Sequence, residues 1–118
     1  MKIKSYKELI AYQKGYELAK EVYQTTRNFP KEELYSLTIQ LRRSAVSVPS
    51  NIAEGYMRGS KEYIQFLKIA LGSCAELETQ LSLSFDIGYC REGDFKRMYD
   101  LNIEVTKLLR SYLRTLCQ

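Results

Sequence analysis

Hydrophobic residues recur at steps of three and four along most of the chain, and this spacing predicts four long helices. They are expected at about 6–26, from Pro30 to about 54–59, from Ser60 to about 88, and from about 94 to 116. No segment alternates with the period of two that is typical of a strand. Four helices joined by short turns favour an all-α fold, an antiparallel up-down-up-down four-helix bundle.

Each helix has one stripe of residues that we expect to form the core. The third is the clearest, because its steps alternate between four and three, as in left-handed bundles. The expected stripes are Leu9, Tyr12, Tyr16, Ala19, Val22, Tyr23 and Thr26; Leu34, Leu37, Leu41, Ala45, Val48 and Ile52; Tyr63, Leu67, Ala70, Cys74, Leu77, Leu81, Ser84 and Gly88; and Phe95, Met98, Leu101, Val105, Leu108, Leu109, Tyr112 and Leu116.

The stretch SVPSNIAEGYMRGSKEY contains both a helix end and a helix start. Pro49 removes one helical hydrogen bond and crowds the carbonyl of Ala45, so we expect the second helix to be kinked there. Gly55 and Gly59 are expected to end that helix and allow the turn. Ser60 is expected to cap the third helix.

The second helix carries two strips besides its core stripe, as its residues follow one another at about 100°. The polar strip comprises Ser36, Gln40, Arg43, Ser47, Asn51 and Glu54, and the apolar strip comprises Ile39, Val46 and Ala53. A monomer needs only one apolar stripe, so we expect the second one to contact another copy of the chain. We assign the polar strip, with Glu76 and Gln80 of the third helix, to packing and to the same assembly. Alternatively, the three apolar residues are simply tolerated at the surface.

Composition indicates an ordinary globular protein without a metal or cofactor. At 118 residues, with 45% hydrophobic and 27% charged residues, the chain is expected to form one domain over residues 1–118. It has no histidine, and its three cysteines are far apart, so neither a zinc site nor a disulfide framework is expected. The first residues contain no long apolar run and no cleavage site, so we expect a cytoplasmic protein.

Catalytic patterns are weak, and we expect no enzyme. Glu54, Glu76 and Glu78 suggest the carboxylates of a di-iron bundle, but that site also needs histidines. A nucleophilic pair of Ser47 and Lys61 has nothing in the sequence to bring its members together. The segment GYMRGS has neither the spacing nor the preceding strand of a phosphate-binding loop.

The positive charge points to nucleic acid as one class of partner. The formal net charge is +4, a mild excess that permits such contact without requiring it. Ten tyrosines add surfaces on which bases could stack. Our candidate contacts are Lys107, Arg110 and Arg114 on one face of the last helix, Arg58 and Lys61 beside the central turn, and Arg42. The alternative is a solvated basic face with the tyrosines in the core.

The central part of the chain reads FPKEELYSLTIQLRRSAVSVPSNIAEGYMRGSKEYIQFLKIALGSCAELETQL. Its segments LTxQLRRxAxSxPSNIAEG and FLxIAxGSxxELETQL are specific, and the similarity covers roughly residues 6–115. The pattern resembles the four-helix bundle family named after 23S rRNA intervening-sequence proteins, also labelled ribosomal protein-like. Two positions depart from it: Ser36, where the family often has glycine, and Ser44, where it often has alanine. The matching positions are Gln40, Leu41, Arg42, Arg43, Ser47, Pro49, Asn51, Ile52, Ala53, Glu54, Gly55, Gly72, Ser73, Glu76, Glu78 and Gln80.

This resemblance implies an antiparallel bundle that assembles into a homopentamer. Some members of the family are encoded within intervening sequences of bacterial 23S rRNA genes, and the family has no established biochemical activity. The chain is also similar, more distantly, to accessory proteins of the reverse transcriptases of diversity-generating retroelements, which bind nucleic acid and the enzyme.

Together, these patterns favour a non-enzymatic, homo-oligomeric bundle that binds RNA or another nucleic acid through a basic surface. The alternative is a protein-interaction scaffold or an accessory subunit, for example of a reverse transcriptase, without direct contact to nucleic acid. The two hypotheses differ in whether binding to nucleic acid falls as salt rises.

Overall fold

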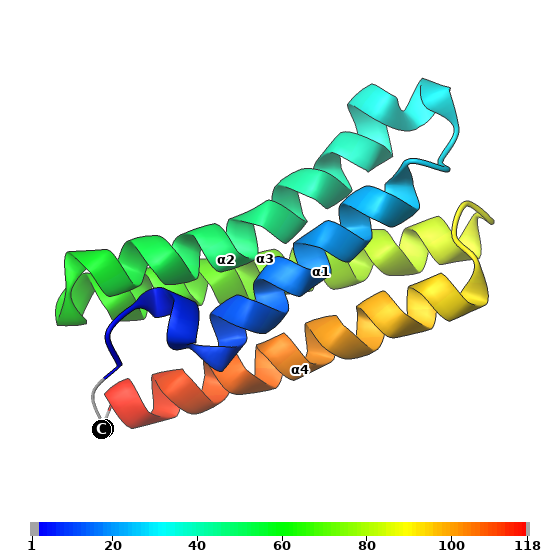
Figure 1. Ribbon diagram of the computed structural model, residues 1–118. Helices are drawn as coiled ribbons and strands as arrows, with labels where there is room; N and C mark the ends of the chain where they lie inside the picture. Colours follow the sequence, from blue (N-terminus) through cyan, green and yellow to red (C-terminus); the bar gives the residue numbers. More distant parts are fainter. Residues whose placement is uncertain (1–2, 118) are drawn as a thin grey trace.

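The computed structural model describes residues 3–117. Within this range the chain forms four α-helices, α1 (Ile10–Thr26), α2 (Ile39–Arg58), α3 (Ser60–Asp86) and α4 (Glu92–Leu116). Shorter helical turns lie at Tyr6–Glu8, Lys31–Glu33 and Leu34–Thr38. Each helix runs opposite to the one before it, in a bundle of about 44 × 23 × 21 Å (Figure 1). The predicted all-α antiparallel four-helix bundle is confirmed.

Helix α1 begins later than predicted and buries a different stripe. Leu9 has an extended backbone, with φ −71° and ψ 127°, which separates the Tyr6–Glu8 turn from α1. The buried residues of α1 are Ala11, Gly15, Leu18, Ala19, Val22 and Thr26. Tyr16 and Tyr23 are 53% and 41% exposed, so their prediction as core residues was wrong. Small and aliphatic residues at steps of four and three face the core, and the tyrosines keep their hydroxyl groups near water.

The chain between α1 and α2 is less regular than the predicted single helix from Pro30. Tyr35 and Ser36 have non-helical backbone angles within the π-helical segment Leu34–Thr38. This interruption changes the helical phase, so residues before it no longer share a face with those after it. Leu34 is 42% exposed, contrary to prediction, whereas Leu37 is buried.

Helix α2 continues through Pro49 and meets α3 at very close range. Figure 1 shows the axis of α2 bending near the middle of the helix, as the proline predicts. Near its end, a Cβ atom on Gly55 would lie 2.7 Å from the Cβ of Phe66. Gly59 then turns the chain into α3 with a φ of 110°, a conformation that glycine adopts without strain. Gly59, not the predicted Ser60, occupies the N-cap position of α3.

Core packing in α3 follows most of the predicted stripe. The buried members of its stripe are Leu67, Ala70, Cys74, Leu77, Leu81 and Ser84. Helix α4 starts at Glu92, two residues before the predicted Asp94, and buries Met98, Val105 and Leu109. No helix among residues 3–117 combines the length and the apolar character needed to span a membrane.

The core also contains an amide that the apolar pattern does not reveal. Asn102 of α4 is fully buried, and its Nδ2 donates a hydrogen bond of 2.9 Å to the backbone oxygen of Cys74 in α3. Its Oδ1 has no hydrogen-bond partner among the described residues. Asn102 therefore ties α3 to α4 by a polar contact in otherwise apolar surroundings.

Candidate nucleic-acid interface

The outer face of α4 carries three exposed cations towards its C-terminal end. Lys107, Arg110 and Arg114 are spaced by three and four residues, so they lie along one strip of the helix. None of them forms an ion pair with any residue in the range 3–117, whereas Lys14 pairs with Glu104 and Lys96 with Asp100. The strip can therefore offer its full charge to an anionic ligand.

The cations beside the turn between α2 and α3 differ in their availability. Arg58 forms ion pairs of 2.8 Å with Glu54 and 3.3 Å with Glu62, and its guanidinium lies 5.0 Å from the centre of the Phe66 ring. Its hydrogen bonds to Glu62 and Glu54 raise the pKa of Arg58 above its ordinary value. Two carboxylates thus offset the charge of Arg58. Lys61 is exposed at the end of the bundle where α4 also ends (Figure 1).

Arg42 lies apart from both groups, between α2 and α1. Its Nε donates a hydrogen bond of 3.0 Å to the Oγ1 of Thr26. The guanidinium lies 4.7 Å from the centre of the Tyr23 ring, within the range of a cation–π contact. The six predicted nucleic-acid contacts therefore do not form one patch.

Part of the predicted polar strip forms a hydrogen-bonded seam between α2 and α3. The Oγ atoms of Ser47 and Ser73 are 2.8 Å apart, and the Nδ2 of Asn51 donates to the backbone oxygen and the Oγ of Ser47. The Oγ of Ser44 donates a bond of 2.9 Å to the Oε1 of Gln80. Ser44 was absent from the predicted strip because it lies one residue beyond Arg43, on the side of α2 that faces α3.

Beside this seam is a polar recess of about 330 Å³, lined by Gln40, Arg43, Ser44, Ser47, Glu76 and Gln80. Arg43 and Glu76 are exposed, and neither forms an ion pair within residues 3–117. Glu54 does not join them, because its carboxylate pairs with Arg58. The recess thus keeps one cation and one carboxylate free for contacts outside the chain.

The predicted apolar strip of α2 faces the chain's own first helix. Ala53 and Val46 line a groove between α1 and α2, and Ile39 and Val46 line a smaller hollow beside it. Val46 is 40% exposed, whereas Ile39 and Ala53 are half-buried. Helix α1 therefore covers part of the strip, and self-association through the strip stays a prediction.

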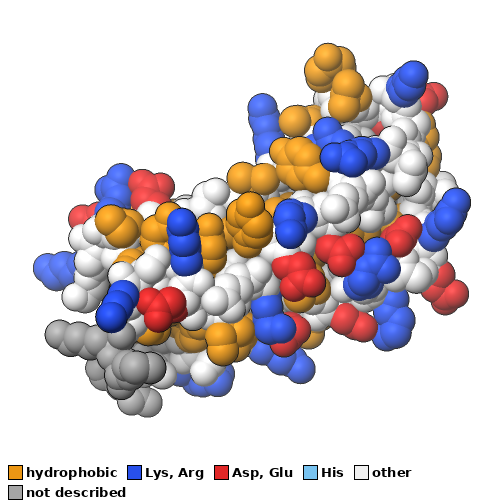
Figure 2. All heavy atoms as spheres, viewed as in Figure 1, with side chains coloured by type: hydrophobic (Ala, Val, Ile, Leu, Met, Phe, Trp, Pro, Cys, Tyr) orange, Lys and Arg blue, Asp and Glu red, His pale blue; other side chains and the backbone are white. Residues whose placement is uncertain are grey.

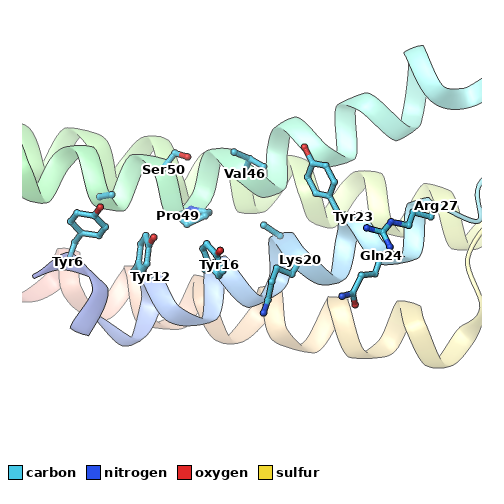
Figure 3. A pocket seen from close by; sticks show the side chains of 12 residues that line it. Tyr6, Tyr12, Tyr16, Lys20, Tyr23, Gln24, Arg27, Val46, Pro49 and Ser50 are labelled. Carbon is cyan, nitrogen blue, oxygen red and sulfur yellow. The ribbon is translucent and has the colours of Figure 1, made fainter.

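The groove between α1 and α2 has a volume of about 600 Å³. Figure 3 shows a row of tyrosines along it, from the Tyr6 turn through α1, opposite Val46, Pro49 and Ser50 of α2. Its lining comprises Tyr6, Tyr12, Tyr16, Ala19, Lys20, Tyr23, Gln24, Arg27, Val46, Pro49, Ser50 and Ala53. The groove was not predicted, because three of these tyrosines were expected to lie in the core. The alternative core stripe of Ala11, Gly15, Leu18 and Val22 was the feature of the sequence that could have revealed it.

Two of the three cysteines, Cys74 and Cys90, are buried. Burial raises the pKa of the Cys74 thiol to about 11, and burial also raises the pKa of Cys90. Both thiols are therefore poor nucleophiles at neutral pH. Among residues 3–117, no three Cys, Asp or Glu side chains gather in an arrangement that could hold a metal ion.

Comparison with known proteins identifies the family. Residues 7–111 match the family model of the 23S rRNA-intervening sequence protein. The chain belongs to this family.

A solved structure supports the assignment of this chain to the 23S rRNA-intervening sequence family. The chain is similar to a crystal structure of a protein of unknown function from the S23 ribosomal protein family of Bacteroides thetaiotaomicron, with 25% identity and a TM-score of 0.79. The alignment covers 88% of this chain and 98% of that one. Among curated proteins, no sequence matches this chain. The more distant similarity to reverse-transcriptase accessory proteins stays a prediction.

Proposed function

We propose that this member of the 23S rRNA-intervening sequence family is a non-enzymatic, homo-oligomeric bundle that binds RNA through the cations of α4. The observation that carries the proposal is the strip of Lys107, Arg110 and Arg114, whose charges no carboxylate in the described chain offsets. Binding of phosphates by such cations releases counterions, which supplies affinity without sequence recognition. Exposed Lys61 lies at the same end of the bundle, at the start of α3.

Salt-dependent binding of a labelled RNA tests this proposal. In Arg110→Glu/Arg114→Glu, we expect weaker binding and a log–log salt slope reduced by about 1.4, since each contact to single-stranded phosphate contributes about 0.7. Fluorescence anisotropy over a range of salt concentrations gives both quantities.

The matched control is Lys31→Glu/Arg91→Glu, which changes the net charge equally at the opposite end of the bundle (Figure 1). It should alter the slope much less. If the wild-type protein binds no RNA or DNA at low salt, the proposal fails, and the alternative of a protein-interaction scaffold or accessory subunit becomes the better explanation.

We further propose that the oligomer, a homopentamer by its family resemblance, forms through the face shared by α2 and α3. Arg43 and Glu76 border the polar recess there, and neither has an ionic partner within residues 3–117. Ile69 and Leu83 precede and follow Glu76 by seven residues, so all three share one face of α3, and the two are 41% and 49% exposed. A neighbouring copy would cover the exposed Ile69 and Leu83 and supply ionic partners for Arg43 and Glu76.

Light scattering tests the assembly. The wild type is expected to have several times the chain mass of 13.8 kDa, five times for a pentamer. Arg43→Glu and Glu76→Arg should each lower that mass, and the double charge swap should restore it if Arg43 of one copy pairs with Glu76 of the next. Val46→Glu tests the sequence-based prediction that the Ile39, Val46 and Ala53 strip is the contact instead. A monomeric wild type would refute both.

A further inference from the structure

We propose that the groove between α1 and α2 binds unpaired bases of a single-stranded nucleic acid, and that it makes the chain prefer single strands to duplexes. This inference rests on the proposed binding of nucleic acid, but it uses a different surface from the α4 strip. Its residues come from the Tyr6 turn, α1 and α2 (Figure 3).

Aromatic faces in the groove are open to the solvent. Tyr16 is 53% exposed and Tyr23 is 41% exposed, although both belong to a regular helix with a well-packed core side. Tyr12 and Tyr16 have ring centres 6.1 Å apart, so aromatic surface continues along the helix. Stacking on such rings tolerates any base, because every base has a π face. A duplex keeps its base faces stacked inside and cannot use them.

The described lining of the groove carries positive charge and no carboxylate. Lys20 and Arg27 line the groove, and Arg42 lines the adjoining hollow. Among the described residues that line either depression there is no Asp or Glu. Figure 2 shows hydrophobic side chains gathered over α1 and α2 with Lys and Arg side chains among them. This combination of aromatic rings and cations is the pattern of single-strand binding surfaces.

Two of these cations already lie close to the tyrosine rings. The Nζ of Lys20 is 5.8 Å from the centre of the Tyr16 ring, and the guanidinium of Arg42 is 4.7 Å from that of Tyr23. A base stacked on the open part of either ring would therefore bring its phosphate near a positive charge. Gln24 and Ser50 add hydrogen-bonding groups to the lining.

The charge also decides against a second copy of the chain as the occupant. The groove has no carboxylate in its described lining, so it offers no partner to the cations that predominate on a second copy, whose formal net charge is +4. A nucleic acid strand would instead neutralise the cations of the groove. The Arg43 and Glu76 face, with both signs of charge, suits self-association better.

The experiment compares two RNAs and two pairs of substitutions. Wild type should bind a labelled single-stranded oligoadenylate of about 12 nucleotides more tightly than a duplex of equal length, measured by anisotropy at one salt concentration. Tyr16→Ala/Tyr23→Ala should weaken single-strand binding at least tenfold, since each stacked base contributes about 5- to 150-fold. Its duplex binding should stay unchanged. Tyr16→Phe/Tyr23→Phe, which keeps both rings, should retain most of the single-strand affinity.

Tyr35→Ala is the matched control, because Tyr35 is 90% exposed but does not line the groove. Helical content by circular dichroism should be the same in all variants. A further control is an oligomer of the same length that lacks bases. It should bind the wild type only as tightly as the oligoadenylate binds Tyr16→Ala/Tyr23→Ala.

The outcomes separate this inference from the proposed function. Equal binding of both RNAs, or no effect of Tyr16→Ala/Tyr23→Ala, overturns the groove assignment even if the Arg110→Glu/Arg114→Glu variant behaves as proposed. If the alanine variant instead lowers the mass measured by light scattering, a second copy occupies the groove. If neither RNA binds at low salt, the proposed function and the inference fail together.

Discussion

Valine in place of Gly55 is expected to lower the free energy of unfolding by about 3 kcal/mol or more, the upper part of the range for overpacked cores. A Cβ at this position would lie 2.7 Å from the Cβ of Phe66 and 3.3 Å from the Cα of Tyr63. The second of these is backbone, so α2 and α3 must separate to accept any side chain. Urea denaturation followed by circular dichroism measures the change.

Gly72→Ala is the internal control for this prediction. Gly72 also lies inside a helix, but a Cβ there would meet nothing within 4 Å. Alanine should therefore stabilise the chain by about 0.5–1 kcal/mol through helix propensity. If Gly55→Val were no less stable than Gly72→Ala, the close contact between α2 and α3 near Phe66 would be wrong.

The second large effect is expected for Asn102→Asp, which should cost about 3–5 kcal/mol near neutral pH because it places an unpaired carboxylate in the core. The introduced carboxyl would have a folded-state pKa above its unfolded value of about 3.9. Its protonated form is the one that the core tolerates. Stability should therefore be regained below about pH 4 and lost as the pH rises through the folded-state pKa.

Asn102→Leu shows whether the amide itself matters. The substitution removes the bond to the Cys74 oxygen together with the unsatisfied Oδ1, so we expect a change of about 1 kcal/mol or less. Urea denaturation of both variants between pH 4 and pH 8 provides the comparison. A pH-independent Asn102→Asp variant would mean that water reaches this part of the core.

The bundle could be predicted from the sequence because, in most of its helices, only one set of positions gives a continuous apolar stripe. In α3, the steps of four and three between Leu67 and Leu81 exclude other faces. In α1 two stripes compete, and the amphipathic tyrosines satisfy the apolar pattern although their hydroxyls favour the surface. The phase change at Tyr35 and Ser36 depends on backbone angles that no local residue pattern reveals.

The candidate sites were predictable only in part, for a related reason. Spacing along α4 places Lys107, Arg110 and Arg114 on one strip, because the geometry of a single helix suffices. Whether Arg58 is free depends on the rotamers of Glu54 and Glu62, and sequence spacing does not fix these. Predicting a groove between two helices, such as α1 and α2, requires knowing which face each helix turns towards the other.

The width of the groove depends on Gly15, a residue of the core. The residue is buried beneath the row of tyrosines, and a Cβ there would lie 3.2 Å from the Cγ1 of Val48 and 3.6 Å from the Cδ of Pro49. Its missing side chain thus sets the spacing of α1 and α2 at this crossing. A methyl group there would require the Val48 side chain, or the helix that carries it, to give way by a few tenths of an ångström, and any separation of the two helices would open the tyrosine row without altering a residue that lines it. The width available to a ligand is therefore fixed by a residue that the ligand would not contact.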